Sequence, residues 1–193
     1  MPHPCTKRHT GTRSCTALGR RRGLSLVEML CSLAISALLL GSAVPLFNDL
    51  RLGQRLQAAA ALLETDIHYA RSSAISTNQP VRLVVQSLQA GGSCYLLHTG
   101  ASGACECTSL HEARCDAGAR LLRIEVLPPA AGVTLAGLAH PLVFDGRKAT
   151  VTPTATLRLA ARDGRAIHQV VNIMGRVRSC SPAGSVGGLR RCT

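Results

Sequence analysis

The sequence LSLVEMLCSLAISALLLGSAVPLF occupies residues 24–47, directly after the basic run Arg20-Arg21-Arg22-Gly23. Glu28 is its only charged residue. As an α-helix rising about 1.5 Å per residue, this segment would extend about 36 Å, enough to cross a hydrocarbon core about 30 Å thick. The arginines before it would remain in the cytoplasm, because positive residues are retained on that side. We therefore expect residues 24–47 to form a single membrane-spanning helix.

Glu28 distinguishes this segment from other targeting sequences. A secretory signal cut near Ala43, or a twin-arginine signal built on Arg21-Arg22, would have an apolar core without a carboxylate. A carboxylate in a membrane segment costs about 2.5–3.5 kcal/mol on insertion scales, so it usually has a partner and a role. An ordinary membrane anchor that contains a chance glutamate is the remaining alternative.

Gly23 followed by Leu24-Ser25-Leu26-Val27-Glu28 resembles the type IV prepilin signature, in which a basic leader ends in glycine and glutamate stands fifth after the cleaved bond. The resemblance implies that a prepilin peptidase removes residues 1–23, that Leu24 is N-methylated, and that Glu28 acts in assembly. It also implies a bacterial inner-membrane protein whose partners are other pilin or pseudopilin subunits. The chain departs from the pattern in having leucine at position 24, where phenylalanine is usual, and a longer leader.

Beyond the apolar run, residues 48–78 are expected to continue the helix with one apolar face. Apolar residues recur at intervals of three or four positions, which is typical of an amphipathic helix. Asn78-Gln79-Pro80 should end the helix, because proline disfavours helical geometry in the residue before it. The apolar face consists of Leu52, Leu56, Ala59, Leu63, Ile67, Ala70 and Ala74.

Residues 79–193 are expected to form a β-rich globular domain. The clearest hairpin joins residues 155–161 to residues 166–173 through Asp163-Gly164, a pair that favours a type I′ turn. A helix followed by strands indicates an α+β fold, with an antiparallel sheet packed on the helical stripe. The other candidate strands are residues 81–85, 95–98, 122–126, 133–135, 142–144 and 149–151.

Two further segments extend the resemblance. Residues 144–147 (Phe-Asp-Gly-Arg) with residues 155–159, and the closing residues 170–180, resemble the sheet of the GspH/FimT family of minor pseudopilins. The resemblance implies a pilin-like fold and a structural role in a type IV pilus or in a type II secretion pseudopilus. Gly175-Arg176-Val177-Arg178 resembles the pilus branch, FimT, more closely than the secretion branch. The cysteine-rich residues 94–120 match only loosely.

Charge is concentrated at the two ends of the chain. The chain has 22 Lys and Arg against 10 Asp and Glu, a net charge of +12, and residues 147–193 contain nine of the bases and one of the acids. If residues 170–178 form one strand, Arg176 and Arg178 point to the same face. Arginine presents a planar fork of donors that suits phosphate oxygens.

This basic tail has two interpretations. The FimT resemblance implies binding of double-stranded DNA through Gly175, Arg176 and Arg178. A bridge between Cys180 and Cys192 would bring Arg190 and Arg191 near them. Arg147 and Lys148, from a nearby turn, would join the same cluster. Since the chain has only two Tyr, two Phe and no Trp, such binding should ignore sequence and weaken with salt. The alternative is a solvated basic surface that only maintains solubility.

Six of the nine cysteines lie beyond the predicted membrane segment, and in an oxidising compartment an even set indicates disulfides. Cys180 with Cys192 is the favoured pair, and Cys105 and Cys107 are too close to bond comfortably to each other, which makes Cys94 and Cys115 their partners. The alternative is a metal site formed by Cys105, Cys107, Cys115 and His111, although its spacing fits no familiar zinc pattern.

No catalytic chemistry is predicted. The sequence has no Gly-x-Ser-x-Gly elbow, no His-Glu-x-x-His helix and no phosphate-binding loop, and its carboxylates form no obvious acid/base pair. We therefore expect a structural or binding protein without a cofactor or a resident metal.

Overall fold

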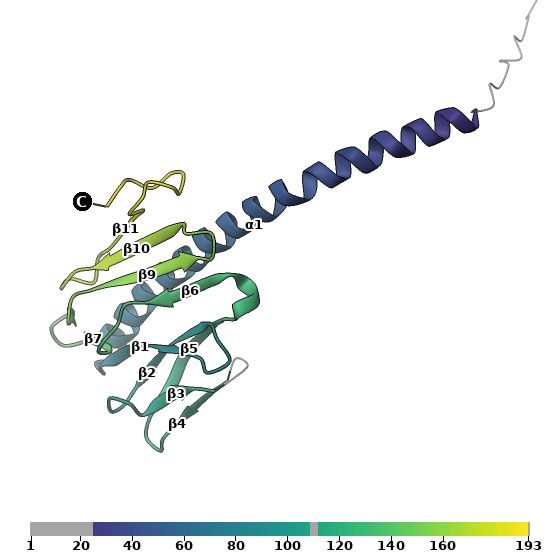
Figure 1. The fold of residues 1–193 in the computed structure, drawn as a ribbon. Helices are drawn as coiled ribbons and strands as arrows, with labels where there is room; N and C mark the ends of the chain where they lie inside the picture. Colours follow the sequence, from purple (N-terminus) through teal and green to yellow (C-terminus); the bar gives the residue numbers. More distant parts are fainter. Residues whose placement is uncertain (1–24, 109–111, 193) are drawn as a thin grey trace, which may run out of the picture. The chain divides into compact units, whose positions relative to one another are not determined.

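The computed structural model describes residues 25–108 and 112–192, except for the side chains of residues 42–46. The leader, Gly23 and Leu24 lie outside the described residues. The chain divides into two compact units, Met1–Ala43 and Val44–Thr193. Helix α1 is Leu26–Thr77 (Figure 1), and the strands are β1 Val81–Ser87, β2 Ser93–Thr99, β3 Cys105–Cys107, β4 Ala113–Cys115, β5 Arg120–Leu127, β6 Val133–Ala136, β7 Leu142–Asp145, β8 Thr150–Thr152, β9 Ala155–Ala161, β10 Ala166–Val171 and β11 Val177–Cys180, with a short 3₁₀ helix, η1 (Pro129–Ala131), before β6.

Helix α1 ends where the sequence predicts. Asn78 follows Thr77 with a left-handed φ of 53°, a conformation that asparagine tolerates and that closes a helix, and Pro80 prevents continuation. The buried stripe differs from the prediction at one position, because Ala60 is buried while Ala59 is only partly buried. The stripe is Leu52, Leu56, Ala60, Leu63, Ile67, Ala70 and Ala74.

Among the described helical residues, no stretch is both long enough and apolar enough to cross a membrane. The predicted span, residues 24–47, includes Leu24 and the side chains of residues 42–46, which are outside the described part of the chain.

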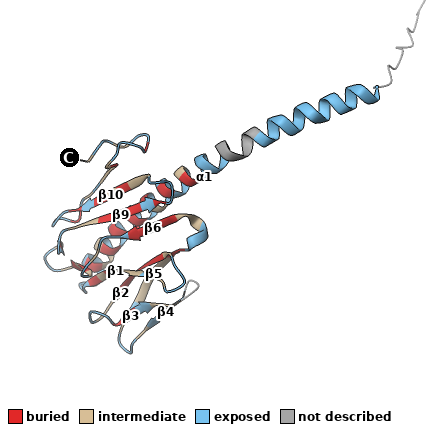
Figure 2. Ribbon diagram, viewed as in Figure 1, coloured by how far each residue is buried: buried red, intermediate tan, exposed pale blue. Residues whose placement is uncertain are grey.

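Two antiparallel sheets share one core with the second half of α1. The strand order is β5-β2-β1-β7-β8 in the first sheet and β11-β10-β9-β6 in the second. Figure 2 shows buried residues on the second half of α1 and on strands of both sheets. The core cluster combines the helical stripe with side chains such as Leu83, Tyr95, Phe144, Leu159 and Ile167. The predicted α+β fold, a long helix packed on antiparallel sheets, is confirmed.

The turn predicted between β9 and β10 is wrong in type. The N–H of Ala161 donates to the carbonyl of Arg165 (2.8 Å), and the N–H of Gly164 donates to the carbonyl of Ala161 (3.0 Å), so the loop has three residues. Gly164 has a φ of +88°, whereas Asp163 is not left-handed. A type I′ turn needs positive φ at both central residues, and only the glycine adopts it here.

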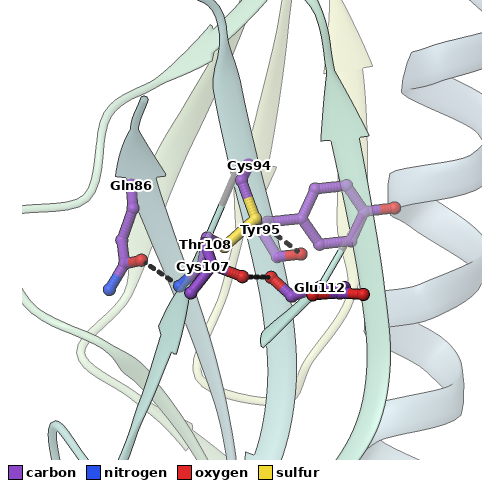
Figure 3. The surroundings of a disulfide bond; sticks show 6 residues. All are labelled: Gln86, Cys94, Tyr95, Cys107, Thr108 and Glu112. Atoms are coloured by element: carbon purple, nitrogen blue, oxygen red, sulfur yellow. Dashed lines mark hydrogen bonds between the residues drawn. A yellow bond between two sulfur atoms is a disulfide. The ribbon is translucent and has the colours of Figure 1, made fainter. Parts of the chain in front are cut away.

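A disulfide-bonded insert, the hairpin of β3 and β4, lies against the outer face of β2 in the first sheet. Strand β2 is buried on both faces: Tyr95 points toward α1, while Cys94 points to the opposite side, where it is bonded to Cys107 (Figure 3). The side-chain oxygen of Gln86 accepts a 2.7 Å hydrogen bond from the N–H of Cys107. The insert therefore provides a second, smaller buried layer, which includes Leu96 and Cys105.

Candidate assembly and anion-binding sites

The first described turn of α1 carries the residue predicted to act in assembly. Glu28 is exposed and lies in the first turn of the helix, where a negative charge is favoured by the helix dipole. The apolar residues around it are exposed as well, including Leu26 (75%), Leu30 (57%) and Leu38 (76%). A helical surface this apolar needs a lipid or protein partner, because monomeric soluble proteins rarely expose such a contiguous patch. Gly23 and Leu24 lie outside the described residues.

The predicted strand over residues 170–178 is wrong, because a tight turn interrupts it after Val171. The side-chain oxygen Oδ1 of Asn172 accepts hydrogen bonds from the N–H of Met174 (3.0 Å) and from the N–H of Arg176 (2.9 Å). Asparagine readily makes such turns with its own side chain. Arg176 therefore belongs to the turn, and Arg178 belongs to β11.

Gly175 is buried within this turn and has a structural reason to be glycine. Its φ is +71°, and a Cβ at this position would lie 2.7 Å from Cδ of Arg71 and 3.2 Å from a methyl group of Val151. The role of Gly175 that the structure shows is to close the turn against α1 and β8.

The outer face of the second sheet is basic. Arg158 on β9 lies opposite His168 on β10, and His168 lies opposite Cys180 on β11. Directly opposed residues of antiparallel strands share a face, and Arg178 shares it because it is two residues from Cys180. Partial burial, and secondarily the charge of Arg158, hold the pKa of His168 below its usual value. The imidazole is therefore neutral at pH 7, and the charge of this face comes from arginine.

The C-terminal tail is fastened to the end of β11. Cys180 and Cys192 form a disulfide, the N–H of Ser181 donates to the carbonyl of Arg190 (3.0 Å), and the N–H of Cys192 donates to the carbonyl of Ser181 (3.1 Å). Arg190 and Arg191 are exposed. The bridge therefore holds the backbone of both arginines beside Ser181, directly after the end of β11.

Arg147 and Lys148 lie in the turn between β7 and β8, and both are exposed. Their N–H groups donate to Oδ1 of Asp145 at 2.9 and 3.1 Å. The bond from Lys148, and next the bond from Arg147, lower the pKa of Asp145. The turn is therefore fixed by backbone contacts, and both basic side chains remain in solvent.

The six cysteines beyond the predicted membrane segment are all in disulfides. The bonds are Cys94–Cys107, Cys105–Cys115 and Cys180–Cys192, the partners that the spacing favoured. The alternative metal site is therefore not formed, because three of its four proposed ligands are in disulfides and His111 is outside the described residues. Within residues 25–108 and 112–192, no cluster of three or more His, Cys, Asp or Glu side chains could hold a metal ion.

Sequence analysis did not identify two buried polar residues that join α1 to the sheets. Asp66 on α1 accepts a hydrogen bond from the hydroxyl of Tyr95 on β2, and Gln169 on β10 donates a 2.7 Å hydrogen bond from Nε2 to the carbonyl oxygen of Ala60. Asp66 occurs next to Ile67 of the buried stripe, which is the only sequence signal for it. Gln169 occupies an inward position of an alternating strand, which a polar residue seldom does.

Known protein families and proteins are similar to this chain. The model of the family described as type II transport protein GspH matches residues 59–175, and the prokaryotic N-terminal methylation motif matches residues 18–44. The pilin-like protein PilA1 of Thermus thermophilus is 34% identical over 159 residues, covering 82% of this chain and 97% of its own length. A crystal structure of the type IV minor pilin FimU of Pseudomonas aeruginosa (strain PAO1) covers 65% of this chain and 87% of its own, with 21% identity and a TM-score of 0.46.

Proposed function

This chain belongs to the family of the type II transport protein GspH, whose members are pilin-like structural subunits, and we propose that it is a minor subunit of a type IV pilus or of a type II secretion pseudopilus. The observation that carries the proposal is the methylation motif over residues 18–44 joined to a globular unit of this family. A prepilin peptidase would cut after Gly23, and Leu24 would become the N-methylated first residue. Residues 24–47 would hold the subunit in the inner membrane before assembly, with the globular unit in the periplasm.

The proposal gives Glu28 a specific task. In a filament, its carboxylate would pair with the amino terminus on Leu24 of a neighbouring subunit. A carboxylate buried without a partner is costly, so this pairing would select one axial register between subunits. The exposed apolar surface of residues 26–41 would be covered by the helices of neighbouring subunits at the same time.

Mass spectrometry of the mature N-terminus, in a host that makes the peptidase, tests processing. We expect a chain that begins at N-methyl-Leu24, and unprocessed precursor when Gly23 is replaced by a bulky residue. An intact Met1, or a mature N-terminus near Val44, would contradict the proposal. Glu28→Ala should be processed normally and be depleted from sheared filaments, with Glu64→Ala as the control. Normal incorporation of the Glu28 variant would exclude the pairing.

Binding of double-stranded DNA is the second candidate function, and the basic outer face of the second sheet favours it. Arg158 and Arg178 share that face, and Arg176 lies in the turn just before β11. Arg190 and Arg191 lie near the end of β11, where the Cys180–Cys192 disulfide holds the tail. Within residues 25–108 and 112–192, none of these five arginines is in an ion pair. Arginines of this kind would contact phosphates without reading base sequence.

A gel-shift assay with residues 48–193 and duplex DNA tests this second function. Binding should weaken steeply as salt rises, because phosphate contacts release counterions. The variant with both Arg176→Gln and Arg178→Gln should bind more weakly. The matched control is Arg114→Gln with Arg120→Gln, two exposed arginines outside the second sheet. If the first variant binds as well as the parent does, the basic face is only a solvated surface, and the filament proposal is unaffected.

A further inference from the structure

Two loops, η1 and the turn between β9 and β10, contact α1 near the start of the globular unit. Nη1 of Arg55 on α1 lies 3.5 Å from the carbonyl oxygen of Ala131 in η1. The N–H of Arg162, in the turn, donates a 2.9 Å hydrogen bond to the carbonyl of Gly132. A Cβ on Gly132 would lie 3.1 Å from Cδ1 of the buried Leu52 and 3.3 Å from Cδ of Arg162. Arg55 and Arg162 therefore lie at the same end of the globular unit.

Three exposed arginines gather at this end. Arg51 precedes Arg55 by four residues, so their side chains share one face of α1. Among the side chains that the structure describes, no ion pair involves Arg51, Arg55 or Arg162. We call these three exposed residues the basic rim.

Two acidic residues beside the basic rim leave its net charge positive. Nε of Arg165 donates a 2.7 Å hydrogen bond to Oδ2 of Asp163, so the charge of this carboxylate is already balanced. Nη2 of the same guanidinium donates a 2.8 Å hydrogen bond to the carbonyl of Asp49, which fastens the β9–β10 turn to α1. The Asp49 carboxylate then opposes three arginines, and this end of the globular unit attracts anions.

The basic rim directly follows the segment that the proposed function places in the bilayer. Phe47 ends that segment, and Arg51 stands four residues later. Phe47 is 61% exposed and Leu50 is 56% exposed, and exposed apolar side chains beside basic ones are typical of helices at a lipid surface. Positive residues close to the end of a membrane helix favour the cytoplasmic side, whereas these would lie on the opposite side. Membrane orientation therefore does not explain the arginines, and another role is needed.

We propose that the basic rim binds the phosphates of anionic phospholipids at the periplasmic surface of the inner membrane and holds the η1 end of the globular unit against the bilayer before assembly. This inference rests on the proposed function, because residues 24–47 must be in the membrane for the rim to reach it. Basic residues next to a membrane segment are attracted to anionic lipid, and the planar guanidinium suits phosphate oxygens. The arginines proposed to contact duplex DNA lie elsewhere, on the second sheet and the tail.

Fluorescence quenching in the full chain, reconstituted into vesicles, tests the proposal. The chain has no tryptophan, so Ala130→Trp in η1 introduces a unique fluorophore beside the rim. Met174→Trp is the reference, because the adjoining Gly175 lies beside Arg71, about 30 Å from Arg51 along α1. All vesicles contain the same fraction of a lipid with a nitroxide on its headgroup, in either phosphatidylglycerol with phosphatidylethanolamine or phosphatidylcholine.

The reporter at position 130 should be quenched more strongly in the anionic vesicles than in the neutral ones. A tether alone would bring it equally close to both lipids, so the difference between them measures docking of the rim. This difference should shrink as salt is raised, because surface attraction is screened. The reference at position 174 should be quenched weakly in both lipids.

The decisive variant adds Arg55→Gln and Arg162→Gln to the tryptophan reporter. It should lower the ratio of docked to undocked chains in anionic vesicles by roughly tenfold or more. Arg114→Gln with Arg120→Gln removes the same charge from two other exposed arginines, and this control should be quenched as the parent is. All four side chains are exposed, and residues 48–193 contain all the buried residues of the described chain and all three disulfides, so the melting temperature should not change.

The proposal is overturned if quenching at position 130 is equal in the two lipids, if the rim variant is quenched like the parent, or if the control loses as much quenching. A rim variant that docks normally but is depleted from sheared filaments would assign the arginines to a neighbouring subunit instead. Extraction of the full chain from the vesicles by alkaline carbonate is a separate outcome. It would contradict the membrane anchor of the proposed function, and this inference with it.

Discussion

The hydroxyl of Tyr95 on β2 donates a 2.8 Å hydrogen bond to Oδ2 of Asp66 on α1, and both residues are buried. Burial, and next the bond to Asp66, raise the pKa of Tyr95 far above its usual value, so the hydroxyl stays protonated and remains a donor. Arg123 also lies near Asp66, with its Nε 3.9 Å from Oδ1, but its side chain is 58% exposed. Tyr95 is therefore the principal buried partner of this carboxylate.

Replacing Tyr95 with phenylalanine should lower the free energy of unfolding of residues 48–193 by about 1–3 kcal/mol, because a buried acceptor loses its donor. Urea unfolding with the disulfides intact measures the loss, and the slope of the transition should not change. Tyr69→Phe is the matched control, since the Tyr69 ring is partly exposed and would keep its contact with the guanidinium of Arg123, which lies 5.2 Å from the ring centroid. Equal stabilities of parent and Tyr95→Phe would show that the bond contributes nothing.

Gly146→Ala should destabilise the globular unit by about 1–3 kcal/mol, because overpacking forces the backbone to shift. A Cβ on Gly146 would overlap the carbonyl oxygen of Ala74 in the last turns of α1. Gly187→Ala is the control, since nothing lies within 4 Å of the position where its Cβ would be. Thermal unfolding of both variants should separate them clearly. A Gly146 variant as stable as the Gly187 variant would mean that the helix end moves freely.

Removing the tail disulfide with Cys180→Ser and Cys192→Ser should lower the free energy of unfolding by about 3 kcal/mol, as expected for a short closed loop. The amides of Ser181 and Cys192 should then exchange faster with deuterium, because the hydrogen bonds that fasten the tail would open. Amides in the middle of β9 serve as the internal reference and should exchange as before. Unchanged protection of Ser181 and Cys192 would show that the hydrogen bonds alone hold the tail.

Arg158→Gln should raise the pKa of His168 toward its usual value, as measured by NMR titration of the imidazole. Burial remains the larger cause of the lowered pKa, so the recovery should be partial. Arg120→Gln, in the first sheet, should leave the titration unchanged. If the pKa of His168 is the same in Arg158→Gln as in the parent, the charge of Arg158 does not affect the protonation of His168.

The lowered pKa of His168 also predicts how the stability of the folded chain depends on pH. Below about pH 6.5 the unfolded chain binds a proton at position 168 more readily than the folded chain does, so the folded state loses stability as the pH falls through that range. His168→Gln should reduce this dependence between pH 7 and pH 5. An identical pH profile in the variant would assign the dependence to other groups.

Local sequence patterns predicted most of the helix and strand boundaries. The features that they did not predict depend on contacts with other parts of the chain. Asn78-Gln79-Pro80 predicts the end of α1 because its signals act on neighbouring residues. The buried stripe shifts from Ala59 to Ala60 because residues 58–61 are all alanine, which gives no local signal for which of them faces the sheets. The turn after Val171 depends on the side chain of Asn172 bonding two later N–H groups, which alternation of apolar residues does not reveal.

For the candidate basic and disulfide sites, the sequence predicted the residue types better than their positions in space. The basic residues and the even set of cysteines can be counted in the sequence, but the position of Arg176 depends on the turn. Asp66 and Gln169 could not be predicted to pair as they do, since Tyr95 is 29 residues from Asp66 and Ala60 is 109 residues from Gln169. Such pairs exist only once the helix and the sheets have packed.

The two buried attachments of α1 also have a mechanical consequence. Ala60 is tied to Gln169 of the second sheet, and Asp66 is tied to Tyr95 of the first sheet, at points about 9 Å apart along the helix axis. A tensile load applied along α1 would therefore enter both sheets almost together, as shear across hydrogen bonds and packed side chains. Neither sheet could peel from the helix while the other carried the load, so the globular unit would resist extension as a single body.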